Sequence, residues 1–117
     1  MSYIVDANGI VTECTDKKAK KIVIKEGVKE IAPEVFTGCE MEVIYLPNSL
    51  KRIGYLAFYS CPRLRKVYFG NGLKVIEQEA FAYCFSLKSV KLPESIDLVG
   101  RYSFVGIDEM MKLRSRI

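Results

Sequence analysis

The chain has 117 residues, of which half are hydrophobic and about a quarter are charged, as expected for one soluble globular domain. Its net charge of +4 permits an acidic partner without requiring one. Histidine is absent, so the commonest general base near neutral pH and a common zinc ligand are both missing. We therefore expect a protein that is not an enzyme and that uses no metal or other cofactor.

Residues 1–21 are predicted to form an N-terminal cap. Strand-like residues flank Asn8-Gly9, and this dipeptide is the strongest short signal for a β-hairpin. The basic run at 17–21 is interpreted as a solvated loop of the cap. A nucleic-acid site needs a basic stripe joined to base-reading or stacking elements, and here the second basic group lies at the opposite end of the chain. Binding of nucleic acid is therefore not expected.

From residue 22 onward, apolar residues recur at a step of 22 or 23 residues. A fixed step of this length is typical of a solenoid, in which each unit stacks on the next to complete the core. Six columns keep one register, which chance does not produce. The predicted repeats, within a single domain at 1–117, cover 22–43, 44–66, 67–89 and 90–112. The two clearest columns are Phe36, Phe58, Phe81 and Phe104, and Ile31, Ile53, Ile76 and Val99.

Each repeat contains the same predicted elements. A short strand with alternating apolar residues comes first, as in 64–69, and a turn built from Pro, Gly, Asn or Ser follows it. A second extended segment leads into a short helical turn, where Ala57, Phe58 and Cys61 would share one helical face. The sequence thus predicts an α/β solenoid with a parallel concave sheet and short helical turns on the convex side.

Two stretches match a known repeat pattern almost residue for residue. They are MEVIYLPNSLKRIGYLAFYSC at 41–61 and LKSVKLPESIDLVG at 87–100. The pattern resembles the unit of the BspA-type leucine-rich repeat family, L-x-x-V-x-L-P-x-S-L-x-x-I-G-x-x-A-F-x-x-C, and extends over 22–110. Ile107 departs from it by replacing the last cysteine. The resemblance implies a right-handed leucine-rich repeat stack, a bacterial source, and a role in protein binding or adhesion without naming a ligand.

Three cysteines, Cys39, Cys61 and Cys84, form one column of the repeat. A thiol is small and apolar enough to fill the convex turn. Stacked residues of one column point in parallel, which disfavours a disulfide, and no Cys-x-x-Cys pair supports a zinc site. We therefore expect free thiols with a structural role in this column. Cys14 lies in the cap, and the sequence leaves its state open.

Strand alternation leaves one residue of each repeat pointing outward from the concave sheet, which places two tyrosines beside lysines. Tyrosine gives rigid, amphipathic contact area and is enriched at binding hot spots. Alternatively, aromatic and β-branched residues occur there because they favour strands. The candidate residues for binding a protein partner are Val43, Tyr45, Lys66, Tyr68 and Lys91.

A second candidate surface lies on the convex side, where several aromatic residues occupy columns expected to be exposed. Such a cluster would serve a homodimer or a structural, self-associating module. Packing between neighbouring turns is the other interpretation. The members are Tyr55, Leu56, Tyr59, Tyr83 and Phe85.

The two ends of the chain leave alternatives open. Residues 108–117 form either a C-terminal helix capped by Asp108 or a further partial repeat, because Leu113 falls in step with Val90. The start lacks a basic segment followed by an apolar stretch, and no run reaches the roughly 18 apolar residues of a membrane span. We expect a complete chain to be cytoplasmic, and a fragment of a secreted protein to be extracellular or at the cell surface.

Overall fold

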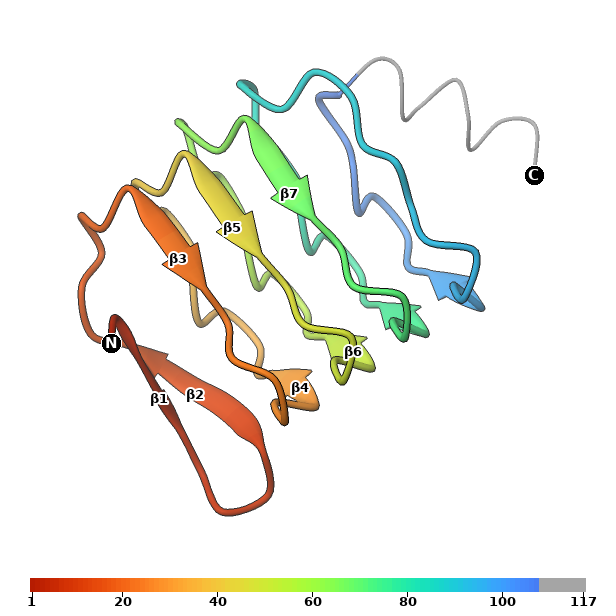
Figure 1. Ribbon diagram of the computed structural model, residues 1–117. Coiled ribbons are helices and arrows are strands. Elements are labelled where there is room, and N and C mark those ends of the chain that lie inside the picture. The colour runs from red at the N-terminus through yellow and green to blue at the C-terminus, as the bar shows by residue number, and fades with distance from the viewer. Residues whose placement is uncertain (108–117) are drawn as a thin grey trace.

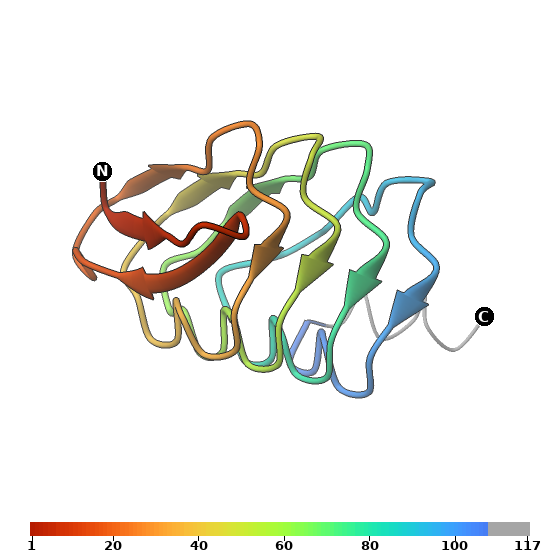
Figure 2. The same cartoon turned by 90° about the horizontal axis from the view of Figure 1, so that it is seen from below.

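The computed structural model describes residues 1–107, and the predicted C-terminal helix or strand at 108–117 lies outside that range. The chain winds through coils that stack along one axis (Figure 1), and Figure 2 shows the two sheets that the coils build. The long sheet has the order β1 (Tyr3–Val5), β2 (Ile10–Cys14), β4 (Glu30–Ile31), β6 (Arg52–Ile53), β8 (Val75–Ile76) and β9 (Leu98–Val99). The short sheet has the order β3 (Lys21–Val23), β5 (Val43–Tyr45) and β7 (Lys66–Tyr68).

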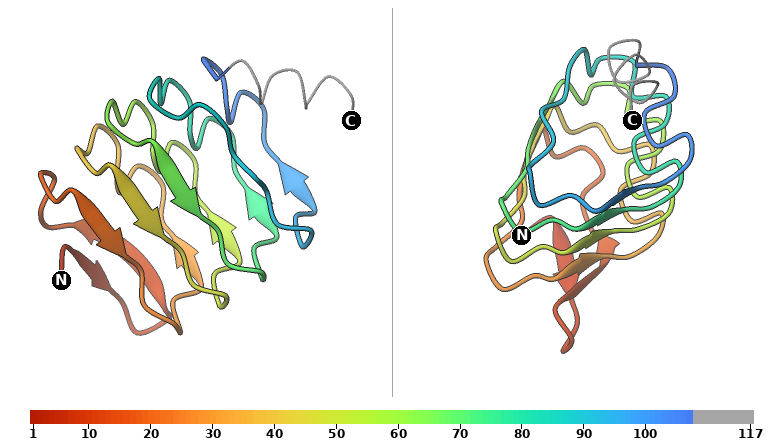
Figure 3. Two further views of the ribbon diagram at one scale, coloured as in Figure 1. Left: turned by 45° about the horizontal axis from the view of Figure 1, so that its top comes forward. Right: turned by 90° about the vertical axis from the view of Figure 1, so that its right-hand side faces the viewer.

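Both sheets keep the register predicted from the repeat. In the short sheet, Ile22 pairs with Ile44, and Ile44 pairs with Val67, all in parallel. Each repeat contributes equivalent residues, so the coils follow one outline when seen along the stack (Figure 3). The long-sheet column runs through Ile31, Ile53, Ile76 and Val99. These pairings confirm the predicted solenoid with a parallel sheet. The second extended segment of each repeat forms a further sheet, the long one, which the sequence did not predict.

The N-terminal hairpin covers the first coil. β1 and β2 are antiparallel, and β2 continues the long sheet by pairing in parallel with β4. Asp6 shapes the turn, because its Oδ1 accepts hydrogen bonds from Asn8 N at 2.8 Å and Ile10 N at 3.0 Å. The Tyr3 hydroxyl donates to Val23 O at 2.9 Å and accepts from Lys25 N at 3.0 Å. The cap thus extends the long sheet, and its Tyr3 hydroxyl forms hydrogen bonds with the backbone at the end of β3.

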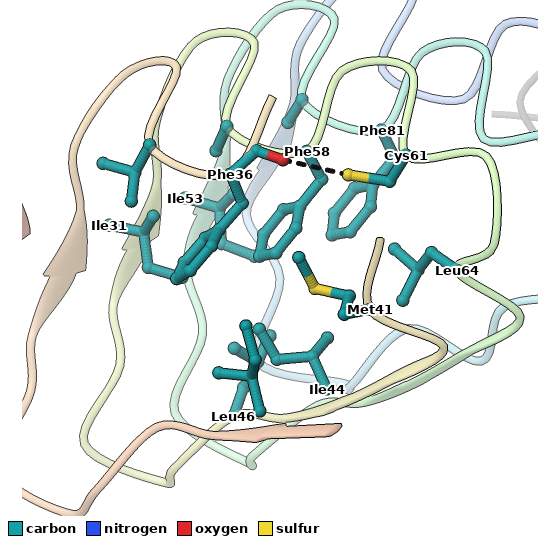
Figure 4. Packing of buried hydrophobic residues seen from close by; sticks show 14 of the residues in the cluster. Ile31, Phe36, Met41, Ile44, Leu46, Ile53, Phe58, Cys61, Leu64 and Phe81 are labelled. Carbon is teal, nitrogen blue, oxygen red and sulfur yellow. Dashed lines mark hydrogen bonds between the residues drawn. The ribbon is translucent and has the colours of Figure 1, made fainter. Parts of the chain in front are cut away.

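A ladder of four phenylalanine rings runs through the core. Successive rings are stacked with centroids 5.3, 4.8 and 5.4 Å apart, and all four side chains are fully buried. Figure 4 shows Phe36, Phe58 and Phe81 in a row, with Met41 and Leu64 close by. Burying a large apolar side chain contributes about 1.5–3 kcal/mol relative to leaving it exposed. The ladder therefore joins each repeat to the next.

The convex side contains no helix within residues 1–107, so the predicted short helical turns are wrong there. The backbone enters the left-handed region twice in each repeat, with φ between 53° and 91°, and such residues interrupt a right-handed helix. No membrane-spanning helix is found in this part of the chain either. The left-handed residues form two columns, Glu34, Leu56, Glu79 and Tyr102, and Gly38, Ser60, Tyr83 and Gly106.

Hydrogen bonds between repeats explain why these turns are not helical. Phe58 N donates to Ala80 O at 2.7 Å, and Ser60 N donates to Ala82 O at 2.8 Å, both in the following repeat. An α-helix would direct the same N–H groups to carbonyls four residues earlier in the chain. The turns therefore add a third line of backbone hydrogen bonds between neighbouring coils.

Candidate functional site

The short sheet presents two exposed tyrosines on its outer face. Tyr45 and Tyr68 pair in register, and their rings are stacked with centroids 4.6 Å apart and planes 4° apart. Their exposed fractions are 37% and 44%, whereas Ile44, the strand neighbour of Tyr45, is fully buried. Strand alternation thus directs the tyrosine pair outward, as the sequence predicted.

Two lysines of the short sheet lie over these rings. Lys21 Nζ is 5.5 Å from the centroid of Tyr45, and Lys66 Nζ is 5.4 Å from the centroid of Tyr68. Cation–π contacts at exposed sites contribute about 0.5–1 kcal/mol. Val43 lies between the two lysines in the register and is half-buried. Four of the five candidate binding residues therefore share one continuous face.

Lys91 is the exception, because the short sheet stops at β7. At the two intact junctions, Ile24 N donates to Tyr45 O and Leu46 N donates to Tyr68 O, both at 2.9 Å. The equivalent bond at the next junction would join Phe69 N to Lys91 O, and it is not formed in the described chain. The prediction that Lys91 continues the sheet column is therefore wrong.

A hollow of about 460 Å³ lies where the fourth strand of the short sheet would pair with β7. We call this hollow the β7 gap. Sequence reasoning missed it, because the repeat pattern predicts a strand at 89–91. The gap is lined by Arg65, Lys66, Val67, Tyr68, Phe69, Lys88, Ser89 and Lys91.

The predicted aromatic cluster on the convex side is partly assembled. Tyr59 and Tyr83 make an edge-to-face contact with ring centroids 5.6 Å apart, and Tyr83 lies 5.9 Å from Phe85. Phe85 is 61% exposed. Tyr102, at 53% exposed, is a further aromatic residue on this side that the sequence analysis did not select, although it lies in step with Leu56.

The cysteine column has a structural role that includes hydrogen bonding. Cys61 Sγ donates to Phe36 O at 3.0 Å, as the dashed line in Figure 4 shows, and Cys84 Sγ donates to Phe58 O at 3.0 Å. Each thiol thus reaches a carbonyl of the preceding repeat, which the sequence analysis did not foresee. Cys39, in the first repeat, has the cap residue Cys14 as its neighbour, with 3.7 Å between the two sulfur atoms.

The chemistry of these thiols follows from their surroundings. Burial, together with the Cys14 thiol, raises the pKa of Cys39 to about 12. The neighbouring Cys84 thiol, with burial, raises the pKa of Cys61 far above its ordinary value. The raised pKa values of Cys39 and Cys61 favour the protonated thiol over the nucleophilic thiolate at neutral pH. Within residues 1–107, no group of three or more Cys, Asp or Glu side chains is placed to hold a metal ion.

Comparison with known proteins identifies one family. The family model described as BspA type Leucine rich repeat region matches residues 12–114 in six copies. A search of the curated proteins finds no match.

Several solved bacterial structures share the fold. A leucine-rich repeat protein from Bacteroides capillosus has 24% identity and a TM-score of 0.77, with 91% of this chain and 88% of that chain covered. The pneumococcal vaccine antigen PcpA has 35% identity and a TM-score of 0.72, with coverages of 77% and 23%. A leucine rich cell surface protein from Faecalibacterium prausnitzii has 23% identity and a TM-score of 0.70, with coverages of 85% and 30%. The chain thus spans less than a third of the last two proteins.

The family match and the structure agree. The match extends over most of the chain, and the strands pair at the step of the repeat. Leucine-rich repeat proteins are generally modules for protein interaction or adhesion, and their fold is typically not enzymatic. The chain belongs to the BspA-type leucine-rich repeat family.

Proposed function

We propose that this protein is a non-catalytic interaction module that binds a protein partner through the outer face of the short sheet. The observation that carries this proposal is the stacked, exposed pair of Tyr45 and Tyr68. The pair is flanked by Val43 and Lys66, which extend the face along the same strands. The proposal applies in either predicted compartment, the cytoplasm or the cell surface.

The tyrosine pair suits binding for energetic reasons. Tyrosine buries a large apolar area on association while its hydroxyl remains available for hydrogen bonding. Because Tyr45 and Tyr68 already stack on each other, little conformational entropy is lost when a partner covers them. An aromatic hot spot typically contributes about 2 kcal/mol or more to binding. Two adjacent anchors are therefore enough to dominate an interface.

The test is affinity capture from lysate and cell-surface fractions with the parent protein and with Tyr45→Ala/Tyr68→Ala. Removal of two outward strand residues should leave the protein folded, with a loss of well under about 1 kcal/mol each. Captured proteins should be lost with this variant. A matched control is Tyr55→Ala/Tyr102→Ala, which removes two exposed tyrosines from the convex side, away from the contact between Tyr83 and Phe85. If the folded short-sheet variant still retains the same partners, the proposal is wrong.

A second candidate function is self-association through the convex side. The contact between Tyr83 and the exposed ring of Phe85 favours it, since exposed aromatic clusters mark many interaction sites. Sedimentation velocity of the parent protein and of Tyr83→Ser/Phe85→Ser tests this candidate. A monomer at all concentrations would remove it.

A further inference from the structure

The β7 gap exposes backbone groups that the repeat would otherwise pair. Lys66 N donates backward to Glu42 O, and Tyr68 O accepts backward from Leu46 N. Alternate residues of a strand within a parallel sheet direct their backbone groups to opposite neighbours. The N–H and C=O of Val67 therefore point forward, into the gap. No backbone hydrogen bond joins 65–69 to 88–92 in the described chain.

The inward side chains of β7 and of the residue that follows it are more exposed than the equivalent side chains one repeat earlier. Ile44 and Leu46 are buried, whereas the equivalent residues Val67 and Phe69 are only half-buried. The missing strand is the difference, because the strand beyond β5 is present and the strand beyond β7 is not. An added strand with apolar side chains on its inward positions would restore this cover.

The charged groups around the gap are all basic. Arg65, Lys66, Lys88 and Lys91 line it, and no acidic residue does. Arg65 has one carboxylate partner, Glu42, at 3.7 Å, and solvent weakens such an exposed pair. The three lysines form no ion pair with a carboxylate among residues 1–107. The outer rim of the gap is thus complementary to negative charge.

We propose that the β7 gap binds an extended acidic peptide segment that pairs with β7 as an added strand. This inference rests on the proposed function and names the chemistry of the partner. The occupant has apolar side chains toward Val67 and Phe69 and carboxylates toward the lysines. A polyanion such as a nucleic acid would satisfy the charges but could not provide the alternating N–H and C=O groups that the edge of β7 requires.

The probe for this inference is a fluorescein-labelled ten-residue peptide of alternating glutamate and valine, titrated by fluorescence anisotropy. We expect binding that weakens with added salt, because the rim contacts are exposed charges. Amide hydrogen exchange should slow at Val67 and Phe69 when the peptide binds. Two control peptides should each bind at least about tenfold more weakly. A lysine–valine peptide carries positive instead of negative side chains, and a backbone N-methylated glutamate–valine peptide lacks the N–H groups that would donate to β7.

The variant that tests the site is Lys88→Glu/Lys91→Glu, which should weaken the acidic peptide about tenfold or more. The matched control is Lys18→Glu/Lys20→Glu, which makes the same change of net charge at exposed residues of the cap and should alter affinity less than about twofold. Equal loss in both variants, binding without slower exchange at Val67, or no binding at millimolar peptide overturns the inference. Full competition by an unlabelled oligonucleotide of matched charge also overturns it.

The same variants distinguish this inference from the proposed function. If the tyrosine-pair variant loses captured partners and Lys88→Glu/Lys91→Glu retains them, the short sheet is the binding surface and the gap is not. If both variants lose the same partners, the gap and the tyrosine pair form one site. If both variants retain them, neither proposal stands.

Discussion

The two sheets of this solenoid are built by the same repeat, yet they differ in length. The long sheet passes through every coil from β1 to β9, whereas the short sheet has three strands and stops at β7. In the long sheet, a β-branched residue fills the inward column at each level from Ile31 to Val99. In the short sheet, the outward column changes from Tyr45 and Tyr68 to Lys91 in the next repeat. The repeat pattern therefore continues into the fourth level of the short sheet, while the strand pairing does not.

The physical reason lies in the pairs across neighbouring strands. A cross-strand pair of aromatic or β-branched residues adds roughly 0.2–1 kcal/mol to pairing. The stacked pair Tyr45–Tyr68 supplies such a contribution between β5 and β7. At the next junction, Ser89 would face Lys66 and Lys91 would face Tyr68, so neither pair offers aromatic stacking. The short sheet ends at the level where this stacked pair has no counterpart.

The largest expected effect breaks both sheets at once. Phe58→Ala should destabilise the protein by about 3–5 kcal/mol, because Phe58 is fully buried and its ring stacks on both neighbouring phenylalanines. Thermal unfolding followed by circular dichroism measures this loss. Phe85→Ala is the control, since Phe85 is exposed and should change stability by no more than about 0.5 kcal/mol. Similar melting temperatures for the two variants would mean that the ladder is not the shared core of the sheets.

A smaller effect is expected on the convex side, which both sheets share. Cys61→Ala and Cys84→Ala should each cost about 1–2 kcal/mol through lost packing and a lost thiol–carbonyl contact. Denaturant unfolding measures these values. Reductant should not change the melting temperature, because the four cysteines are free thiols. A mass two units low for any pair of the column cysteines would contradict this prediction.

A third prediction removes the difference between the sheets. Ser89→Val/Lys91→Tyr restores a β-branched residue and a tyrosine at the fourth level of the short sheet. The new tyrosine should stack on Tyr68 as Tyr45 does, and the double variant should gain about 1 kcal/mol. Hydrogen exchange should slow at Phe69, whose N–H would then have a partner. Unchanged exchange at Phe69 would show that side-chain composition is not what ends the sheet. Lys91→Ala is the control that removes charge without adding a ring.

The smallest effect concerns the turns that replace the predicted helices. Ser60 has a φ of 53°, and its column neighbours Gly38 and Gly106 also have positive φ. Ser60→Gly should raise stability by about 0.5 kcal/mol, since relief of left-handed strain slightly exceeds the added entropy of the unfolded chain. Ser60→Ala keeps the side-chain strain and should bring no gain. A loss with glycine would mean that the hydroxyl of Ser60 matters more than its backbone conformation.

Much of the fold is readable from the sequence because inward residues recur at a constant step. The columns containing Ile31, Phe36 and Tyr45 lie where the repeat predicts them, and the tyrosine pair faces outward as strand alternation requires. The sequence predicts helical turns on the convex side wrongly, because the spacing of Ala57, Phe58 and Cys61 suits one face of a helix as well as it suits the two non-helical turns that the structure has there. The β7 gap was also missed, since residues 87–100 match the repeat pattern while their strand does not pair.

The sequence by itself determined which residues are equivalent in successive coils, because a constant step and a strand period of two require only the order of residues along the chain. The tertiary structure decided what each set of equivalent residues does. Cys61 Sγ donates a hydrogen bond to Phe36 O, and Ser60 N donates to Ala82 O, whereas Phe69 N has no strand beside it to accept its hydrogen bond. Each of these outcomes depends on backbone groups in a neighbouring coil, about 22 residues away in the chain, which no local pattern contains.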